Sequence, residues 1–264
     1  MKIRFLVFAL VVGFVGVQFA YADSYQSKPA VSGINTKVSA GYADLDATSV
    51  KFGSASVTLP LTHSWGFTID GLGGDYSASS LWGVGGNLFW RNPDKGLLGI
   101  MGSNVLVGAN NASRGGVSGE LYRGPFSILV DVGYGTGDTI KHGVFSDLIL
   151  RWYVMDNFAL STGCTYSGGN TAGVVGMEYM PSLKIFSDLS LFARGSWGED
   201  DYHSVVAGIK YYFGKGKTLK QKHREDDPEN MALGGLLLGN QGQGGFIEPL
   251  ETPPPKIEEE EPEG

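Results

Sequence analysis

Residues 126–135 read FSILVDVGYG, and this stretch decides the fold. Every second side chain, from Phe126 through Val130 to Tyr134, is apolar, whereas the residues between them include Asp131 and two glycines. A period of two is typical of a β-strand with one apolar and one polar face. About nine residues with an aromatic at each end match a tilted strand that crosses a membrane. The stretch therefore predicts a strand of a transmembrane β-barrel.

The same alternation recurs in five further segments. Their outward rows run from Ile34 to Tyr42, Trp82 to Trp90, Phe158 to Tyr166, Leu189 to Trp197 and Val205 to Phe213. Aromatics close one or both ends of nearly every row, as in the girdles at the two membrane interfaces. The expected interface aromatics are Tyr42, Trp65, Trp82, Trp90, Phe126, Tyr134, Trp152, Phe158, Tyr166, Trp197, Tyr211 and Phe213. A soluble β-sandwich also alternates, but it has no reason to hold aromatics at two fixed heights.

Short and long connections alternate along the chain, as periplasmic turns and outer loops do in membrane barrels. Compact turns are expected at 60–62, 91–95, 123–125, 155–157 and 181–184, and polar Gly-rich loops at 44–47, 71–80, 109–116, 135–143, 167–171 and 197–203. These connections predict an all-β fold, a closed antiparallel up-and-down barrel of about 12 strands with both ends in the periplasm.

Three segments, 50–59, 97–107 and 112–122, break strict alternation, so ten or fourteen strands stay open. In the first segment, Val50 and Phe52 point to one side and Val57 and Leu59 to the other. A β-bulge would explain this change of side.

The N-terminus has the layout of a cleaved secretory signal. Lys2 and Arg4 precede an apolar run from Phe5 to Val17, and small residues lie at Ala20 and Ala22. We expect cleavage near Ala22, because the run is shorter than a membrane-spanning helix; a retained helix is the alternative. The predicted organisation is a signal peptide at 1–22, a short periplasmic segment at 23–33, a barrel at 34–214 and a largely disordered periplasmic tail at 215–264.

Composition agrees with an exported all-β chain. The sequence has 41 glycines, 12% aromatics and only 18% charged residues. Its single cysteine, Cys164, allows no internal disulfide, so backbone pairing and packing must hold the fold. The net charge of −7 argues against nucleic acid as a partner.

The inward rows hold the charges that are expected to face the lumen. They are Lys37, Asp70, Arg91, Glu120, Asp131, Asp147, Arg151, Glu178, Arg194 and Lys210. A charge on the lipid face costs about 2–4 kcal/mol near the midplane, so any membrane barrel shows this segregation. Two interpretations stay open: the charges fill the lumen as ion pairs, or they line a narrow aqueous pore for small polar solutes. Both signs are present, so no ion selectivity is predicted.

The last predicted strand resembles the assembly signal of proteobacterial outer-membrane β-barrels. Residues 206–213 read VAGIKYYF, with Gly208, Tyr211 and Phe213 at the positions that matter in that group. The group has a polar residue where Val206 stands, and its chains end at the final aromatic. The stretch 211–228 is also similar to the end of porin-like barrels with a C-terminal periplasmic tail. The resemblance implies a place in the cell outer membrane, contact with its lipids and insertion by the barrel-assembly machinery.

No motif indicates an enzyme. Outer-membrane phospholipases place a serine two residues after a histidine, but no serine follows His63, His142 or His203 at that spacing. Asp200, Asp201 and His203 share a predicted loop, as acids and a histidine do in protease-type barrels, although a solvated loop has the same composition. We therefore expect no catalysis, no cofactor and no metal. The predicted function is a porin-like channel or a lumen-filled scaffold; the alternatives are a surface-interaction barrel acting through its outer loops and an outer-membrane hydrolase.

The tail changes its charge along its length. Residues 215–224 are basic with no acid, and the chain from Glu225 onward is strongly acidic. We expect the basic stretch to lie beside inner-leaflet phosphates. The apolar segment 231–238 either docks on the barrel mouth or stays loose, and the Pro- and Glu-rich end from 251 is typical of disorder. A periplasmic partner of the tail is a hypothesis.

Overall fold

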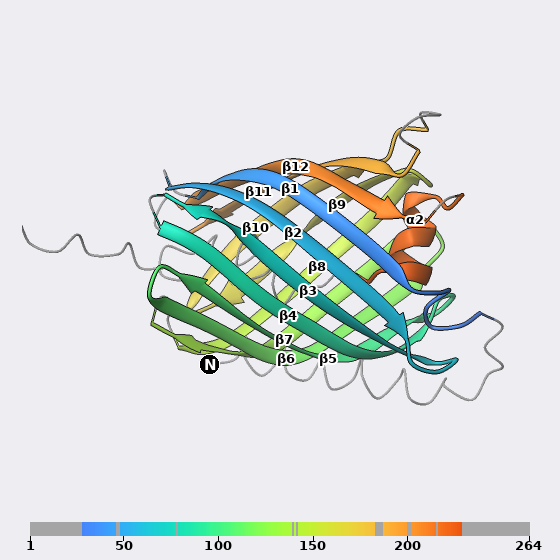
Figure 1. Cartoon of the computed structure of the whole chain (residues 1–264), viewed down its shortest axis with the longest axis horizontal. Helices are drawn as coiled ribbons and strands as arrows, with labels where there is room; N and C mark the ends of the chain where they lie inside the picture. Colours follow the sequence, from blue (N-terminus) through green and yellow to red (C-terminus); the bar gives the residue numbers. More distant parts are fainter. Residues whose placement is uncertain are drawn as a thin grey trace, which may run out of the picture.

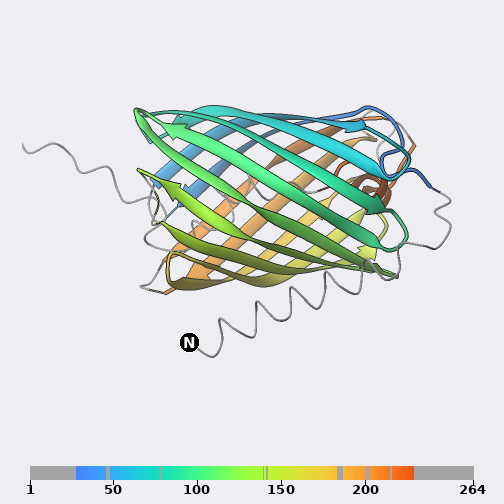
Figure 2. The same cartoon turned by 90° about the horizontal axis from the view of Figure 1, so that it is seen from below.

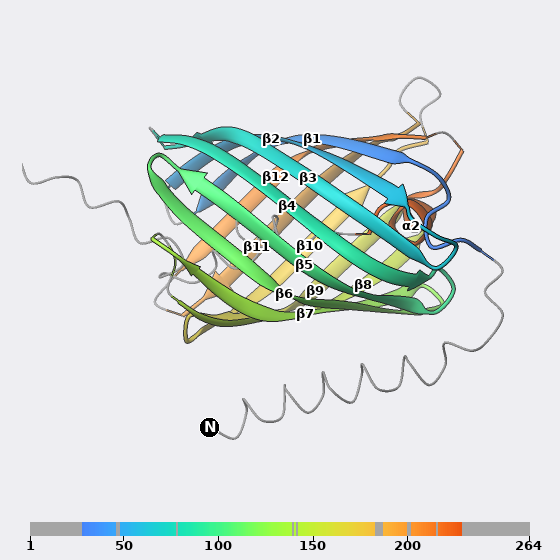
Figure 3. The ribbon, with the colours of Figure 1, turned by 60° about the horizontal axis from the view of Figure 1, so that its bottom comes forward.

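The computed structural model describes residues 28–45, 48–77, 79–138, 140, 142–182, 187–199, 202–214 and 216–228. Within them, twelve antiparallel strands close into one barrel, in which each strand pairs with the next and the first pairs with the last. Figure 1 shows the strands as a tilted cylinder, and Figures 2 and 3 show the same tilt from two further sides. The predicted up-and-down barrel of twelve strands is confirmed. The predicted signal peptide lies outside the described residues, as does the tail beyond residue 228.

The strands run in chain order around the barrel. They are β1 (Asn35–Leu45), β2 (Thr48–Pro60), β3 (Trp65–Tyr76), β4 (Ser79–Asn92), β5 (Gly96–Val107), β6 (Asn110–Arg123), β7 (Phe126–Gly137), β8 (Gly143–Met155), β9 (Phe158–Ser167), β10 (Asn170–Tyr179), β11 (Leu189–Gly198) and β12 (His203–Phe213). After β12 follow a short helix, α2 (Leu219–Gln221), and a π-helical turn, η1 (Lys222–Asp226). The described part of the chain contains no helix that is both long and apolar enough to cross a membrane.

The barrel has two distinct ends. β1 begins and β12 ends at the same end, which we call the terminal end; we call the opposite end the loop end. The loop-end connections are shorter than expected, because β3 runs to Tyr76, β6 begins at Asn110 and β7 runs to Gly137. Glycines in these stretches look like loop in the sequence, but several are paired with both neighbouring strands: Gly71, Gly73, Gly74, Gly115, Gly116 and Gly135. The expected long loops at 71–80 and 109–116 are therefore wrong, whereas the loop expected at 135–143 loses only its ends to β7 and β8.

Strand β2 is regular, and the bulge expected near Val50 is absent. Its Cα registers with β1 and with β3 are unbroken. Val50 and Phe52 are buried on the inward row, whereas Val57 and Leu59 lie on the outward row. The alternation seemed to break because the inward residues near the loop end are themselves apolar.

The outward rows form an apolar belt around the barrel. Exposed large side chains include Val38, Ile69, Ile100, Leu148 and Ile209. Such a surface is stable only against lipid, since each Å² of apolar area in water costs about 25 cal/mol. The closed ladder also leaves no unpaired strand edge in the hydrocarbon.

The expected interface aromatics all lie on outward rows. Tyr42, Trp65, Trp82, Phe126, Tyr134, Trp152, Trp197 and Phe213 are exposed, whereas Trp90, Phe158, Tyr166 and Tyr211 are half-buried among their neighbours. Several pack against one another, as Phe158 does edge-on to Tyr179 with ring centres 6.0 Å apart. Their role as membrane girdles stays a prediction.

A lysine in the middle of the outward row of β8 should be far more costly than one at its end. Leu148→Lys should lower the free energy of unfolding by about 2–4 kcal/mol, because the 48%-exposed Leu148 lies near mid-strand. The matched control Val154→Lys, in the same strand near the terminal end, should cost about 0–1 kcal/mol. Urea unfolding in lipid vesicles measures both, and equal losses would contradict a lipid-facing row.

Candidate functional site

Two segments outside the strands pack inside the terminal end of the barrel. They are residues 28–33 before β1 and residues 216–228 after β12, and together we call them the plug. Figures 1 and 3 show α2 at the right-hand end of the barrel, within the ring of strand ends. Ala30, Val31 and Leu219 are buried to 1% exposure or less. The backbone N–H of Ser32 donates to the carbonyl oxygen of Glu225 at 3.1 Å, which joins the two segments.

Local sequence turns the chain back into the barrel mouth. α2 begins with a capping box, in which the Thr218 hydroxyl accepts from the N–H of Gln221 and the Gln221 side chain accepts from the N–H of Thr218. The N–H of Leu219 donates to the Asn157 side chain in the β8–β9 turn at 3.0 Å. The side chain of Leu219 packs in a buried cluster with Tyr153, Ala159, Met180 and Tyr212. These contacts fix the start of the plug against the wall.

His223 lies in the plug with both ring nitrogens partnered. Its Nδ1 is 3.1 Å from the Tyr153 hydroxyl and 3.4 Å from Nη1 of Arg151. Its Nε2 is 3.1 Å from the Tyr212 hydroxyl, which donates its own proton to Glu178 at 2.8 Å. Tyr212 therefore accepts from Nε2–H, and Nδ1 accepts from its two donors. The contacts specify a neutral imidazole protonated on Nε2.

Glu178 of β10 gathers donors from the two following strands. Its Oε1 accepts from Ser190 at 2.7 Å, and its Oε2 accepts from Lys210 at 2.7 Å. The side chains of both Lys210 and Glu178 are largely buried, so these hydrogen bonds are needed to offset the loss of hydration. Since Oε2 also lies 3.6 Å from Nε2 of His223, the pair links the wall to the plug.

Ion pairs attach the plug to neighbouring parts of the wall, on β1 and beside β11. Lys37 of β1 pairs with Asp227, and Thr58 of β2 donates to the same carboxylate at 3.1 Å. Two strands away from β1, the fully buried Lys222 pairs with Asp188, just before β11, at 2.9 Å. Each of these plug charges therefore faces a wall charge of the opposite sign.

Two arginines bind backbone carbonyls where the plug meets the wall. Arg224 of η1 donates to the carbonyl oxygen of Phe126 at 2.6 Å, at the start of β7. Arg91 of β4 donates to the carbonyl oxygens of Ala30 and His223, and so holds both plug segments. Arginine suits such sites because its planar group presents several donors in fixed directions.

Three cations of the basic stretch lie against the protein itself. Lys217 pairs with Asp226 at 2.5 Å and with Glu225 at 3.3 Å, and Lys222 and Arg224 bind the barrel wall. The expectation of a lipid-facing cluster is therefore wrong for these three residues. Buried carboxylates and carbonyls hold the cations more strongly than phosphates in screened water.

The structure places all ten expected inward charges on the inner side of the barrel. Asp70, Arg91, Glu120, Asp131, Asp147, Arg151 and Glu178 are buried, and Lys37, Arg194 and Lys210 are half-buried. Arg151, Glu178 and Lys210 come together around His223, while Asp131 and Asp147 are direct partners across β7 and β8. That these residues line a pore stays a prediction.

Sequence reasoning missed several members of the site. Arg114 of β6 interacts electrostatically with Asp131 and Asp147, and its guanidinium lies 4.4 Å from the ring centre of Phe145. It shares the inward row with Glu120, a signal hidden by the assignment of 109–116 to a loop. No sequence pattern marks His223 as part of the site, because its partners come from distant parts of the chain.

Comparison with known proteins supports the fold. No family model matches the chain, and no curated protein matches it in sequence. The KdgM porin, solved in complex with disordered oligogalacturonate, is similar with a TM-score of 0.54 at 10% identity, over 67% of this chain and 99% of that chain. An outer-membrane channel from Pseudomonas putida F1 is similar with a TM-score of 0.51 at 10% identity, over 72% of this chain and 98% of that one. The chain thus has a porin-like fold, and its closed, apolar-belted barrel places it in the outer membrane, as the sequence predicted.

Acid should loosen the plug through His223. Burial lowers the pKa of His223 from 6.5 to about 4, with Glu178 opposing the shift and Arg151 adding to it. The docked plug then binds fewer protons than a released one, so docking should weaken as pH falls from about 6.5 to about 4. Hydrogen exchange at the Ser32 and Asp227 amides, corrected for intrinsic rate, should show protection falling over that window. The His223→Gln variant should lose this dependence, and an unchanged pH slope would contradict the assignment.

Proposed function

We propose that the protein is a porin-like channel for small polar solutes whose terminal end is held closed by its own plug. The observation that carries the proposal is the nature of the wall around the plug. Lys37, Arg151, Glu178 and Lys210 project from four different strands and are satisfied by one another and by plug residues. Without the plug, these side chains would face a water-filled passage.

The width of the barrel favours a channel over a scaffold. About eight strands enclose a lumen that wall side chains fill by themselves, whereas sixteen to eighteen leave an aqueous channel. Twelve strands lie between these cases, and the terminal end is filled here by backbone and side chains that belong to no strand. The wall therefore leaves room for a segment of chain, and a small solute needs room of that kind.

Lumenal charges nearer the middle of the barrel fit a passage for polar solutes of either charge. Asp131 and Asp147 lie side by side, and Arg114 interacts with both. Mixed signs at one level favour small polar molecules without strong charge selection.

The alternatives receive less support from the geometry. A surface-interaction barrel would act through its outer loops, yet the loop-end connections are short. For a hydrolase, the described residues offer His142 exposed in a loop and no group of three side chains able to hold a metal ion. Asp200 and Asp201, the acids of the loop considered for catalysis, lie outside the described residues. We infer that the protein is not an enzyme.

We also infer that β12 serves as the signal for the barrel-assembly machinery. Tyr211 and Phe213 lie on its outward row with ring centres 4.9 Å apart. Position 208 needs a glycine, because a Cβ there would come within 2.3 Å of the Ala40 carbonyl oxygen and 2.8 Å of the Phe192 ring. Val206, where the resemblance expects a polar residue, is buried in an apolar cluster of the inner wall, which accounts for the departure. Periplasmic partners of the tail remain a hypothesis.

Conductance of a plug-deleted chain tests the channel. A chain ending at Gly214 keeps all twelve strands and loses residues 216–228 of the plug. In planar bilayers it should conduct with a linear current–voltage relation, whereas the full chain should stay mostly closed. The matched control ends at Pro228, retains the plug and should stay closed as well.

A folded but non-conducting chain ending at Gly214 would reject the channel in favour of the lumen-filled scaffold. Folding of each variant is checked by the shift in gel mobility on heating. Conductance of the full chain equal to that of the deleted chain would reject the plug as the closing element.

A further inference from the structure

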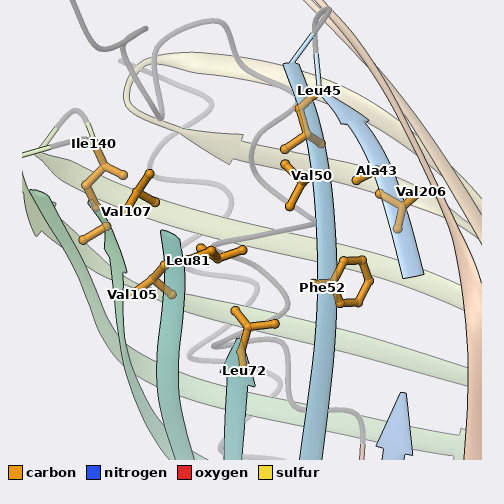
Figure 4. Packing of buried hydrophobic residues seen from close by; sticks show 11 residues of the cluster. Ala43, Leu45, Val50, Phe52, Leu72, Leu81, Val105, Val107, Ile140 and Val206 are labelled. Carbon is orange, nitrogen blue, oxygen red and sulfur yellow. The ribbon is translucent and has the colours of Figure 1, made fainter. Parts of the chain in front are cut away.

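One side of the inner wall, along β12 and β1 to β6, is apolar near the loop end. One buried cluster, which we call the loop-end cluster, consists of Ala43, Leu45, Val50, Phe52, Leu72, Leu81, Val105, Val107, Ala112, Ile140 and Val206. Figure 4 shows its side chains pointing from several strands into the barrel. The interior of a water-filled barrel is ordinarily polar, so this strip differs from the wall expected of an open pore.

The cluster forms a strip that follows part of the circumference of the inner wall. Most of its members come from β12 and β1 to β6, which are consecutive around the barrel. Side chains that stand next to one another on a concave wall shield each other's flanks but not their tips. Nevertheless, every member has an exposed fraction of 7% or less. An apolar occupant in the lumen would stabilise a strip of this kind, because apolar surface in contact with water is costly.

The described chain ends within reach of the cluster. Pro228 is buried and follows Asp227, which pairs with Lys37 on the inner side of β1. Ala43 stands on the same row six residues nearer the loop end. At ~3.3 Å per residue the two positions are about 20 Å apart along the strand, and roughly 15 Å apart along the axis of a barrel with strands tilted by about 40°.

The sequence after Pro228 carries an apolar segment at that distance. Residues 231–238 read MALGGLLL, between polar residues at 229–230 and 240–241. An extended chain covers at most ~3.3–3.6 Å per residue. The first residue of the segment can therefore lie up to about 10 Å from Pro228, and the last up to about 35 Å. Its apolar residues are thus confined to the length that can face the cluster.

We propose that residues 231–238 lie in the lumen against the loop-end cluster, so that the chain covers its own apolar wall. The plug fixes the start of the segment, which raises its local concentration to the mM range and makes a modest affinity sufficient. The proposal concerns a second site, separate from the plug, and it holds whether or not the barrel conducts.

Disulfide crosslinking in the full chain tests the contact. In a Cys164→Ser background, Leu237→Cys is combined in turn with Val50→Cys, Val105→Cys and Val206→Cys, all on the inner wall. Oxidation should crosslink at least one of these pairs efficiently. The matched control pairs Leu237→Cys with Leu106→Cys, which neighbours Val105 but is 42% exposed on the outward row and should not crosslink. Failure at all three inner positions, or equal crosslinking of the control, would overturn the proposal.

Accessibility gives a second readout that does not depend on disulfide geometry. The thiol of Val105→Cys, in the same background, should react with a water-soluble reagent at least about tenfold more slowly in the full chain than in a chain ending at Pro228, the factor that ~1.4 kcal/mol of docking provides. Leu237→Asp should speed the reaction in the full chain, whereas Asn240→Asp, with the same added charge just outside the segment, should not.

Two results would assign the cover to something else. Equally slow labelling after truncation would mean that the wall shields itself. Labelling of the truncated chain that is slow in lipid vesicles and fast in detergent would mean that lipid occupies the strip. Either result overturns the proposal, and neither bears on conductance.

Discussion

The rest of the structure depends on the pairing of β1 with β12. Their register runs without a break from Thr36↔Phe213 to Leu45↔Ser204 and closes the ladder of backbone hydrogen bonds. In hydrocarbon an unpaired N–H or C=O group costs several kcal/mol, so an open edge there is not tolerated. Closure then dictates which side chains meet lipid and how wide the interior is.

The width of this interior determines how much space the two ends of the chain must fill. Twelve strands enclose more space than the wall side chains near the terminal end occupy, and residues 28–33 and 216–228 take up the remainder. Inserting charged groups into so dry a place is tolerable only if each finds partners. Glu178 with three donors, His223 with two partnered nitrogens and Lys222 with Asp188 meet this condition.

The lipid environment makes part of this structure predictable from the sequence. The outward rows, the ten inward charges and the number of strands could be predicted, since hydrocarbon imposes a period of two on each strand. Where the lumen is apolar as well, the contrast disappears, and β2, β5 and β6 became ambiguous through Val50, Val105 and Ala112. The plug escaped prediction because Tyr153 and Tyr212 meet His223 from positions far apart in the chain, and no period records such contacts.

Along β12 and β1 to β6 the lumen therefore has two chemistries in succession, and the C-terminal sequence has the same two in the same order. At the terminal end, charged wall residues such as Lys37 and Glu178 meet the charged residues 217–227. Toward the loop end the wall turns apolar at Ala43 and Val206, and the chain turns apolar at residues 231–238. An unrelated tail has no physical reason to change character over the same distance as the wall. A segment that binds inside this lumen would have such a reason, because each of its residues would contact the wall at a different distance from the terminal end.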